Sequence, residues 1–230
     1  MRSPVDYGLI EQAMAEAEAG GGAVTALFDA AASALEEIAA GRRRLRAVRH
    51  PLGFLCLPVQ REDDRGVCVH VFDAEAPGRA TGLTTSPVHA HSWDLTSCVL
   101  YGQVGNLRIR VRDRPREATH RVYEVRSDGS AVDELRPTQR LVRCEPGPEE
   151  ISAGGEIYTL PAGHFHATVV PPGTAAATLL LGRTLPGRRD LSLGPVHGAP
   201  HRVVRQTCDA AQTARTARTV LRRIDGRLSP

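Results

Sequence analysis

Three histidines of this chain stand at spacings that suit the coordination of one metal ion. His89 and His91 are separated by a single residue, and His166 follows a Pro-Ala-Gly turn at residues 161–163. Side chains at positions i and i+2 of a strand point to the same face, so that two imidazoles in this arrangement reach one ion. The turn opens a further strand, which delivers the third imidazole. We therefore predict that these three histidines bind one divalent metal ion.

The sequence around the histidines resembles two motifs of the cupin superfamily. The second motif, G-x5-P-x-G-x2-H-x3-N, fits from Gly155 to His166 and lacks only its final Asn, where Val170 stands. The first motif, G-x5-H-x-H-x3,4-E-x6-G, fits at both histidines of the pair and at its closing glycine, but Leu95 occupies the glutamate position. The resemblance covers residues 52–183 and implies a small β-barrel that binds a metal ion inside, near one mouth.

The missing glutamate changes the chemistry that we expect. Three neutral imidazoles leave a divalent ion with its full charge and with open coordination positions. This ligand set resembles the thiol dioxygenase branch of cupins, the cysteine dioxygenase-like enzymes, which hold Fe(II) by three histidines. That branch has a Ser-His-x-Tyr set after its third histidine, whereas residues 178–181 here read Thr-Leu-Leu-Leu. We expect the metal geometry of that branch with a different substrate; Fe(II) is favoured, and Zn, Mn or Ni are the alternatives.

Residues near the histidines are candidates for a pocket around the metal. Tyr158 and His164 are the candidate catalytic groups, because a phenol and an imidazole beside a metal ion transfer protons or donate hydrogen bonds. Thr168 and Val170 follow the third histidine with the period of two that keeps side chains on one face of a strand. The tentative substrate pocket comprises His70, Cys98, Tyr101, Thr168 and Val170. The structural alternatives are core packing for the tyrosines, the cysteine and His70, and an exposed turn for His164.

Other polar and aromatic residues are interpreted as structural. Trp93, the one tryptophan, is interpreted as a packing residue or a lid at the mouth of the barrel. Asp94 is interpreted as a capping or loop carboxylate, with the orientation of a ligand imidazole as the alternative. Four histidines in polar or Pro/Gly-rich segments are predicted at the surface: His50, His120, His197 and His201.

The elements that position these residues change character near residue 52. Before it, helical periodicity predicts a helix around residues 5–19 and a second one that stops near Gly41. After it, short apolar runs separated by Gly, Pro and Asp predict antiparallel strands. The predicted strands are 53–60, 66–72, 86–91, 97–104, 106–112, 120–126, 139–144, 156–161, 165–170 and 175–182.

Together the runs and the motifs predict a mostly β protein, a single cupin-type antiparallel β-barrel (jelly roll) with helices at both ends. We divide the chain into a helical extension at 1–51, the barrel at 52–183, and a C-terminal loop and helix at 184–230. The polar segment 113–150 is interpreted as an insertion between the two motifs. In the C-terminal part, Asp209 is the expected cap of a helix near 209–223.

Composition and charge argue against several classes of function. The 230 residues carry 29 basic side chains, all arginine, and 26 acidic ones. The net charge of +3 and the aromatic content of 4% are not those of a nucleic-acid-binding surface. No apolar run reaches the length of a membrane span, and acidic residues interrupt the N-terminal segment where a signal peptide would be apolar. We expect a cytoplasmic protein whose five cysteines are free thiols.

These observations leave three hypotheses for function. The first is an Fe(II)-dependent oxygenase or dioxygenase acting on a small organic molecule, with dioxygen as co-substrate. The second is a non-redox isomerase, lyase or cyclase in which Zn, Mn or Ni acts as a Lewis acid. The third is a barrel that binds a small ligand without turnover. A homodimer is an open expectation, because exposed sheet edges pair readily.

Overall fold

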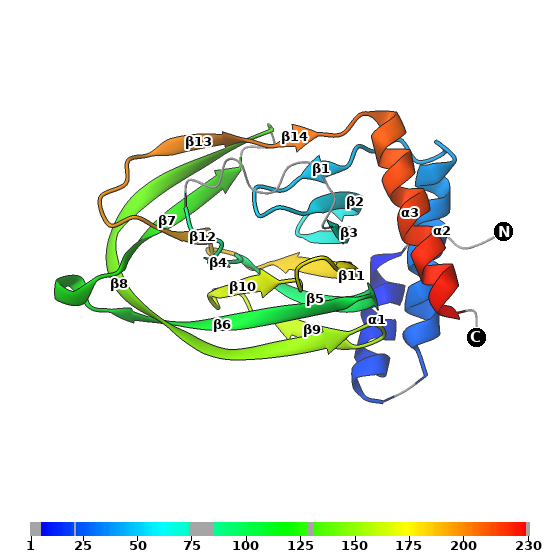
Figure 1. Cartoon of the computed structure of the whole chain (residues 1–230), viewed down its shortest axis with the longest axis horizontal. Coiled ribbons are helices and arrows are strands. Elements are labelled where there is room, and N and C mark those ends of the chain that lie inside the picture. Colours follow the sequence, from blue (N-terminus) through cyan, green and yellow to red (C-terminus); the bar gives the residue numbers. More distant parts are fainter. Residues whose placement is uncertain (1–5, 21, 74–84, 128–130, 229–230) are drawn as a thin grey trace.

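A computed structural model of the chain describes residues 6–20, 22–73, 85–127 and 131–228. Its strands form two seven-stranded antiparallel sheets, and three α-helices gather at one end of the molecule (Figure 1). The predicted fold class, mostly antiparallel β structure with helices from both ends of the chain, is confirmed. None of the described helices is both long and apolar enough to cross a lipid bilayer.

Sheet A has one face toward the helices and the other toward a cavity. In strand β2 (Leu55–Glu62), odd-numbered residues such as Leu57 are buried on the helix side, whereas even-numbered ones such as Cys56 line the cavity. Its strand order is β14 (Gln206–Thr207), β1 (Val48–Arg49), β2 (Leu55–Glu62), β3 (Arg65–Asp73), β11 (Ala175–Thr184), β5 (Trp93–Tyr101) and β9 (Ile157–Leu160). This alternation is the period of two that strands impose.

Sheet B supplies the opposite wall of the cavity. Its strand order is β13 (His201–Val204), β8 (Val132–Ala153), β6 (Gln103–Asp113), β10 (His166–Val169), β4 (His89–Ala90), β12 (Asp190–Gly194) and β7 (His120–Ser127). The 22-residue strand β8 pairs with β6 along its second half and with β7 along its first half. Because β7 is the last strand of the order, this extra pairing joins six strands in a closed ring.

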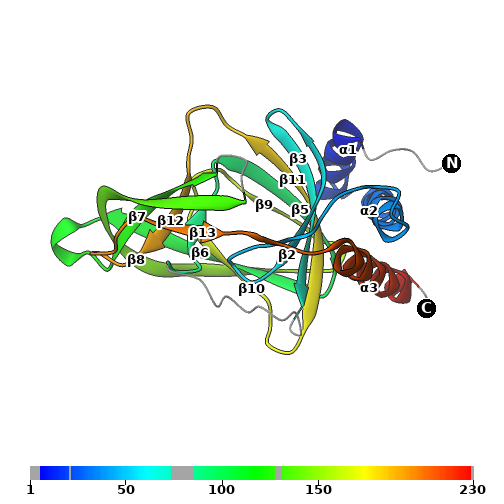
Figure 2. The same cartoon turned by 90° about the horizontal axis from the view of Figure 1, so that it is seen from above.

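Helices α1 (Tyr7–Glu18), α2 (Val24–Ala39) and α3 (Ala210–Leu228) cover the outer face of sheet A (Figure 2). An aspartate caps the N-terminus of α1 and another caps that of α3, in agreement with the preference for a side-chain acceptor at the N-cap. Asp6 accepts from the Leu9 N–H at 3.0 Å, and Asp209 accepts from the Gln212 N–H at 2.6 Å. The helices and the outer face of sheet A bury the largest apolar cluster of the described chain.

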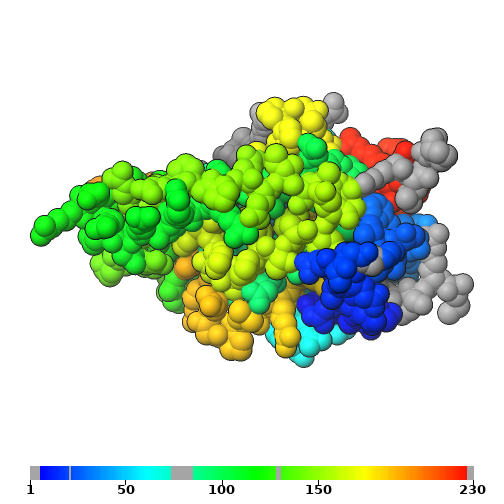
Figure 3. All heavy atoms as spheres, turned by 90° about the horizontal axis from the view of Figure 1, so that it is seen from below, coloured from blue at the N-terminus to red at the C-terminus, as the bar shows by residue number. Residues whose placement is uncertain are grey.

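The sheets extend beyond the predicted barrel segment 52–183. Strands β1, β12, β13 and β14 lie outside it, and three of these four come from the predicted C-terminal loop. The polar segment 113–150 forms β7 and most of β8, and so belongs to sheet B. The space-filling view shows its green atoms projecting at the end opposite the blue N-terminal helices (Figure 3).

Candidate metal centre

The three predicted metal-binding histidines converge in the structure. His166 on β10 is the direct cross-strand partner of His89 on β4, and His91 follows β4 by one residue. The ring centroids lie 4.4 Å apart for His89 and His166, 4.8 Å for His89 and His91, and 5.2 Å for His91 and His166. One nitrogen from each ring lies within 4.8 Å of the others, a spacing that suits three ligands of one ion.

Backbone carbonyls determine which ring nitrogen is free in two of these histidines. The Nδ1 atom of His89 lies 3.0 Å from the carbonyl oxygen of Pro87, and Nδ1 of His166 lies 3.1 Å from that of His164. A carbonyl only accepts, so each Nδ1 carries the hydrogen and each Nε2 keeps its lone pair for a metal ion. The tautomer that metal binding requires is therefore already selected.

Burial keeps the three imidazoles neutral. Desolvation lowers the pKa of His89 and lowers that of His91 well below the ordinary value of 6.5. Desolvation, followed by the neighbouring His89, lowers the pKa of His166 to about 3. Neutral imidazole is the form that donates a lone pair to a metal, so this donor set fits a divalent transition-metal ion.

An apolar side chain stands where the cupin motif has glutamate. Leu95 is 4% exposed, lines the cavity, and packs with Leu160 and Leu180. Trp93, two residues earlier on the same face of β5, contacts His91 in a tilted arrangement with ring centroids 4.3 Å apart. The described part of the centre thus offers three imidazoles and no carboxylate ligand beside them.

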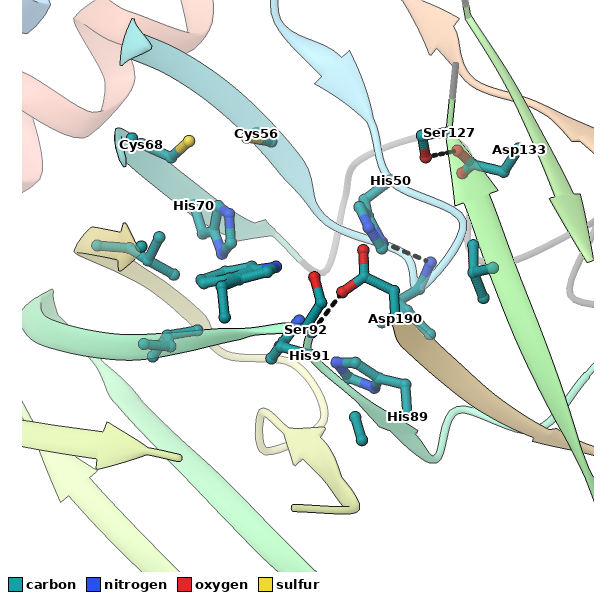
Figure 4. Close-up of a pocket in the computed structure, with 18 of the residues that line it drawn as sticks. His50, Cys56, Cys68, His70, His89, His91, Ser92, Ser127, Asp133 and Asp190 are labelled. Carbon is teal, nitrogen blue, oxygen red and sulfur yellow. Dashed lines mark hydrogen bonds between the residues drawn. The ribbon is translucent and has the colours of Figure 1, made fainter. Parts of the chain in front are cut away.

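The histidines open into a cavity of about 430 Å³ between the two sheets. Figure 4 shows residues from both walls around it: Cys56, Cys68 and His70 from sheet A, and His89 and Asp190 from sheet B. Its volume is that of sites for small organic molecules. The three-histidine group therefore lies at the wall of a cavity of that size.

Three further predicted residues line this cavity: His70, Tyr158 and Thr168. Burial raises the pKa of the Tyr158 phenol above its ordinary value of 10.0, while Ser97, Asn106 and Thr178 beside it act in the opposite direction. The phenol therefore stays protonated at neutral pH and is available as a hydrogen-bond donor.

Two predicted pocket residues face the helices instead. Cys98 is fully buried in the cluster between sheet A and the helices, because even-numbered residues of β5 point away from the cavity. Tyr101 has the parity of the cavity-lining residues, but the pairing of β5 with β11 shifts between Ala177 and Thr178. This irregularity turns Tyr101 to the helix side, where its ring contacts Arg223.

Two other predictions also need correction. Val170 follows the end of β10 and packs in an apolar cluster with Val99 and Val104, and it is not among the residues that line the cavity. The imidazole of His164 is not part of the cavity lining, because the turn before β10 directs the backbone of that residue inward. His164 contributes its carbonyl oxygen, which holds His166, rather than a side chain at the centre.

The structure adds residues that the sequence interpretation assigned elsewhere. His50, expected at the surface, lines the cavity and stacks on Phe54 with centroids 4.4 Å apart. Asp190 accepts from the Ser92 N–H at 2.6 Å, and this bond fixes the chain directly after His91 (Figure 4). In the sequence, the aromatic residue Phe54 four positions after His50 is the local feature that could have indicated the burial of His50.

Charged side chains at the cavity are paired through long-range contacts. Arg205 binds the buried carboxylate of Asp133, which also accepts a hydrogen bond from Ser127. All three residues line the cavity, although the ion-paired Arg205 and Asp133 are 72 positions apart in the chain. Asp94 is a loop-capping carboxylate, one of its two predicted roles, and accepts from the Ala162 N–H at 2.8 Å.

Comparison with known proteins gives distant structural similarity alone. No protein-family model and no curated protein matches the chain. The polyketide cyclase RemF from Streptomyces resistomycificus is 15% identical, with a TM-score of 0.33 over 64% of this chain and 72% of that one.

Two further solved structures are the hydroquinone 1,2-dioxygenase PnpCD and the Fe(II) form of HppE. PnpCD is 15% identical, with a TM-score of 0.34 over 56% of this chain and 63% of its own. HppE is 13% identical, with a TM-score of 0.28 over 56% of this chain and 48% of its own. The chain thus spans less than two thirds of both, and these matches assign no family to it.

Proposed function

We propose that this chain is a cupin-type metalloenzyme acting on a small organic molecule, and that its favoured form is an Fe(II)-dependent oxygenase or dioxygenase. The observation that carries the proposal is the convergence of His89, His91 and His166 as neutral imidazoles at the wall of a cavity between the two sheets. Two of the three are held in the metal-binding tautomer. A structural histidine cluster needs neither property.

Around the ion, the chain's own residues divide the work between binding and exclusion. The three histidines hold the metal, and a bound Fe(II) ion supplies the electrons for the activation of dioxygen. Leu95 adds no negative charge and contributes an apolar wall that excludes water. Tyr158 keeps its proton at the phenol oxygen and is positioned to donate a hydrogen bond to a substrate oxygen in the cavity.

The same absence of a carboxylate favours a second candidate, a Lewis-acid isomerase, lyase or cyclase. A zinc ion bound by three neutral imidazoles keeps its full positive charge, which strengthens its polarisation of a substrate carbonyl. Cavity residues would then orient the substrate and move its proton, and Tyr158 is again the candidate donor. This form needs no dioxygen.

Metal analysis and oxygen uptake test the proposal. Protein purified without added metal is analysed for bound elements, then loaded with Fe(II) anaerobically and assayed for dioxygen consumption with candidate substrates. We expect about one Fe(II) per chain and substrate-dependent oxygen uptake. Stoichiometric zinc at the three-histidine centre without oxygen uptake would favour the Lewis-acid form, and absence of metal from that centre under both conditions would overturn the proposal.

A pair of variants locates the metal. His91→Ala is expected to abolish iron binding at the three-histidine centre, because it removes a buried ligand. His197→Ala, which changes an exposed histidine outside the cavity lining, is the matched control and should retain the metal. In addition, Tyr158→Phe should keep the metal and slow turnover about 100-fold if the phenol donates a proton.

A further inference from the structure

A second group of metal-ligating side chains lies on the opposite wall of the cavity. The sulfurs of Cys56 and Cys68 and a ring nitrogen of His70 all lie within 4.8 Å of one another. All three residues line the cavity and come from neighbouring strands of sheet A, β2 and β3 (Figure 4). They share no residue with the three-histidine centre.

This group repeats the backbone arrangement of the first centre. Cys68 and His70 are separated by one residue of β3, as His89 and His91 are in the first centre. Cys56 on β2 is the direct cross-strand partner of His70, as His166 is of His89. Two ligands at i and i+2 with a third opposite one of them is therefore a geometry that this chain uses twice.

The two thiols are free and close together. Neither Cys56 nor Cys68 forms a disulfide. Their sulfur atoms lie within 4.8 Å of each other and of a ring nitrogen of His70. Sulfurs this close to an imidazole form the donor set that zinc takes in proteins.

We propose that Cys56, Cys68 and His70 form a second metal site, which binds a thiophilic divalent cation of the Zn(II) class on the sheet A wall of the cavity. Binding converts both thiols to thiolates and releases their two protons to solvent, without electron transfer. Three protein ligands leave one tetrahedral position, and this position faces the cavity, where water or a substrate heteroatom completes the coordination.

Charge balance makes two occupied sites compatible in one cavity. Both candidate sites line the same cavity. A second dication with neutral ligands would therefore meet repulsion from the first. Two thiolates cancel the charge of the second ion, so that the two-cysteine site adds no net positive charge to the cavity.

The two sites differ in the softness of their donor atoms and therefore in the metal ions they prefer. Thiolates select zinc and other thiophilic ions, whereas three imidazoles also accept iron, manganese and nickel. The sites are thus expected to hold different metals from the same medium. This inference does not depend on the proposed oxygenase activity, since the second site has its own ligands.

Cobalt(II) is the probe that tests the second site, because cobalt bound to thiolate shows an intense charge-transfer absorption that cobalt bound to imidazole lacks. Reduced, metal-free full-length protein is titrated with Co(II), and zinc is then added in competition. We expect two equivalents of cobalt in the wild type, with the thiolate absorption saturating at one equivalent and lost on addition of zinc.

Three variants assign the signal. His91→Ala should bind one equivalent and keep the thiolate absorption, whereas Cys68→Ser should bind one equivalent without it. Cys144→Ser, which changes a half-buried cysteine outside the cavity lining, should match the wild type. His70→Ala is the second variant of the site, expected to weaken cobalt binding there at least 10-fold.

Two results would overturn the inference: no thiolate absorption in folded His91→Ala protein, or an absorption that persists unchanged in Cys68→Ser. Circular dichroism and the equivalent of cobalt retained at the histidine centre establish that each cysteine variant is folded. A single equivalent of cobalt, bound with the thiolate absorption in both wild type and His91→Ala, would reject the first centre alone, so failures of the two proposals are distinguishable.

Discussion

At the scale of single residues, two backbone carbonyls and one leucine define the chemistry of the centre. The carbonyls of Pro87 and His164 hold His89 and His166 with their Nε2 atoms free. Leu95 replaces a charged ligand with an apolar wall. A metal bound there would be held by neutral groups, and the nearby carboxylate of Asp190 also lines the cavity.

His50 provides a pH-dependent prediction at this scale. Burial, followed by the charge of Arg205, lowers its pKa well below 6.5, and its Nδ1 accepts from the Leu52 N–H at 3.3 Å only when unprotonated. The unfolded chain therefore binds more protons below pH 6.5, and the stability of the folded state falls as pH falls. Between pH 7.5 and pH 5 this residue should cost up to about 2 kcal/mol.

The measurement is urea unfolding of metal-free protein at both pH values, for wild type and His50→Asn. Asparagine keeps an acceptor near the Leu52 N–H but does not titrate, so the variant should lose less stability on acidification. His197→Asn, at an exposed histidine, should follow the wild type. Equal pH dependence in wild type and His50→Asn would contradict the assignment.

At the scale of elements, the contact between β11 and β5 determines the position of a metal ligand. Gly182 on β11 leaves room for the Trp93 ring, since a Cβ there would lie 2.7 Å from the ring atom Cε3. The Trp93 ring in turn contacts the ring of His91. Because Gly182 has no side chain, the ring of Trp93 fits beside β11 and contacts the ring of His91.

Gly182→Ala should weaken metal binding at the three-histidine centre about 10-fold, because the added methyl group displaces Trp93 toward His91. Competition with a chelator of known affinity measures the change. Gly226→Ala in α3 is the control, since its added Cβ meets nothing within 4 Å. The control should leave metal affinity unchanged and raise stability by about 0.5–1 kcal/mol.

At the scale of the whole molecule, sheet A separates a structural core from a chemical cavity. The helices pack on its outer face, and the cavity with both candidate metal sites lies on its inner side. The long strand β8 closes the ring of sheet B and brings Asp133 to the cavity. Stability and chemistry therefore depend on different faces of the same sheet.

Leu35→Ala tests this separation. Leu35 on α2 is fully buried in the cluster between the helices and sheet A. The truncation should lower the free energy of unfolding by about 2–5 kcal/mol, measured by urea denaturation. The metal content of the folded protein should stay unchanged, because the residue lies on the far side of sheet A from the cavity.

Leu9→Ala is the matched control, since Leu9 on α1 is 61% exposed, and it should change stability by less than about 0.5 kcal/mol. A loss of bound metal in folded Leu35→Ala protein would show that the helical layer also supports the site.

Local patterns in the sequence were sufficient for the helices, most strands and the grouping of the three candidate metal-binding histidines. Periodicity identifies a helix or strand within one segment, and the spacing of His89 and His91 assigns them one face. The same period of two placed Asp94 on the other face of its strand from Leu95. These features depend on neighbours in the chain, and the sequence by itself determined them.

The tertiary structure decided which face of each strand meets the cavity. A period of two is equally consistent with either face, so Cys98 was assigned to the wrong side of β5, and the irregularity opposite Ala177 reversed Tyr101. The proximity of Cys56 to Cys68, and of Arg205 to Asp133, arises from pairing between separate strands and segments. Only the packed sheets specify such contacts, because they form between residues whose separation in the chain carries no periodic signal.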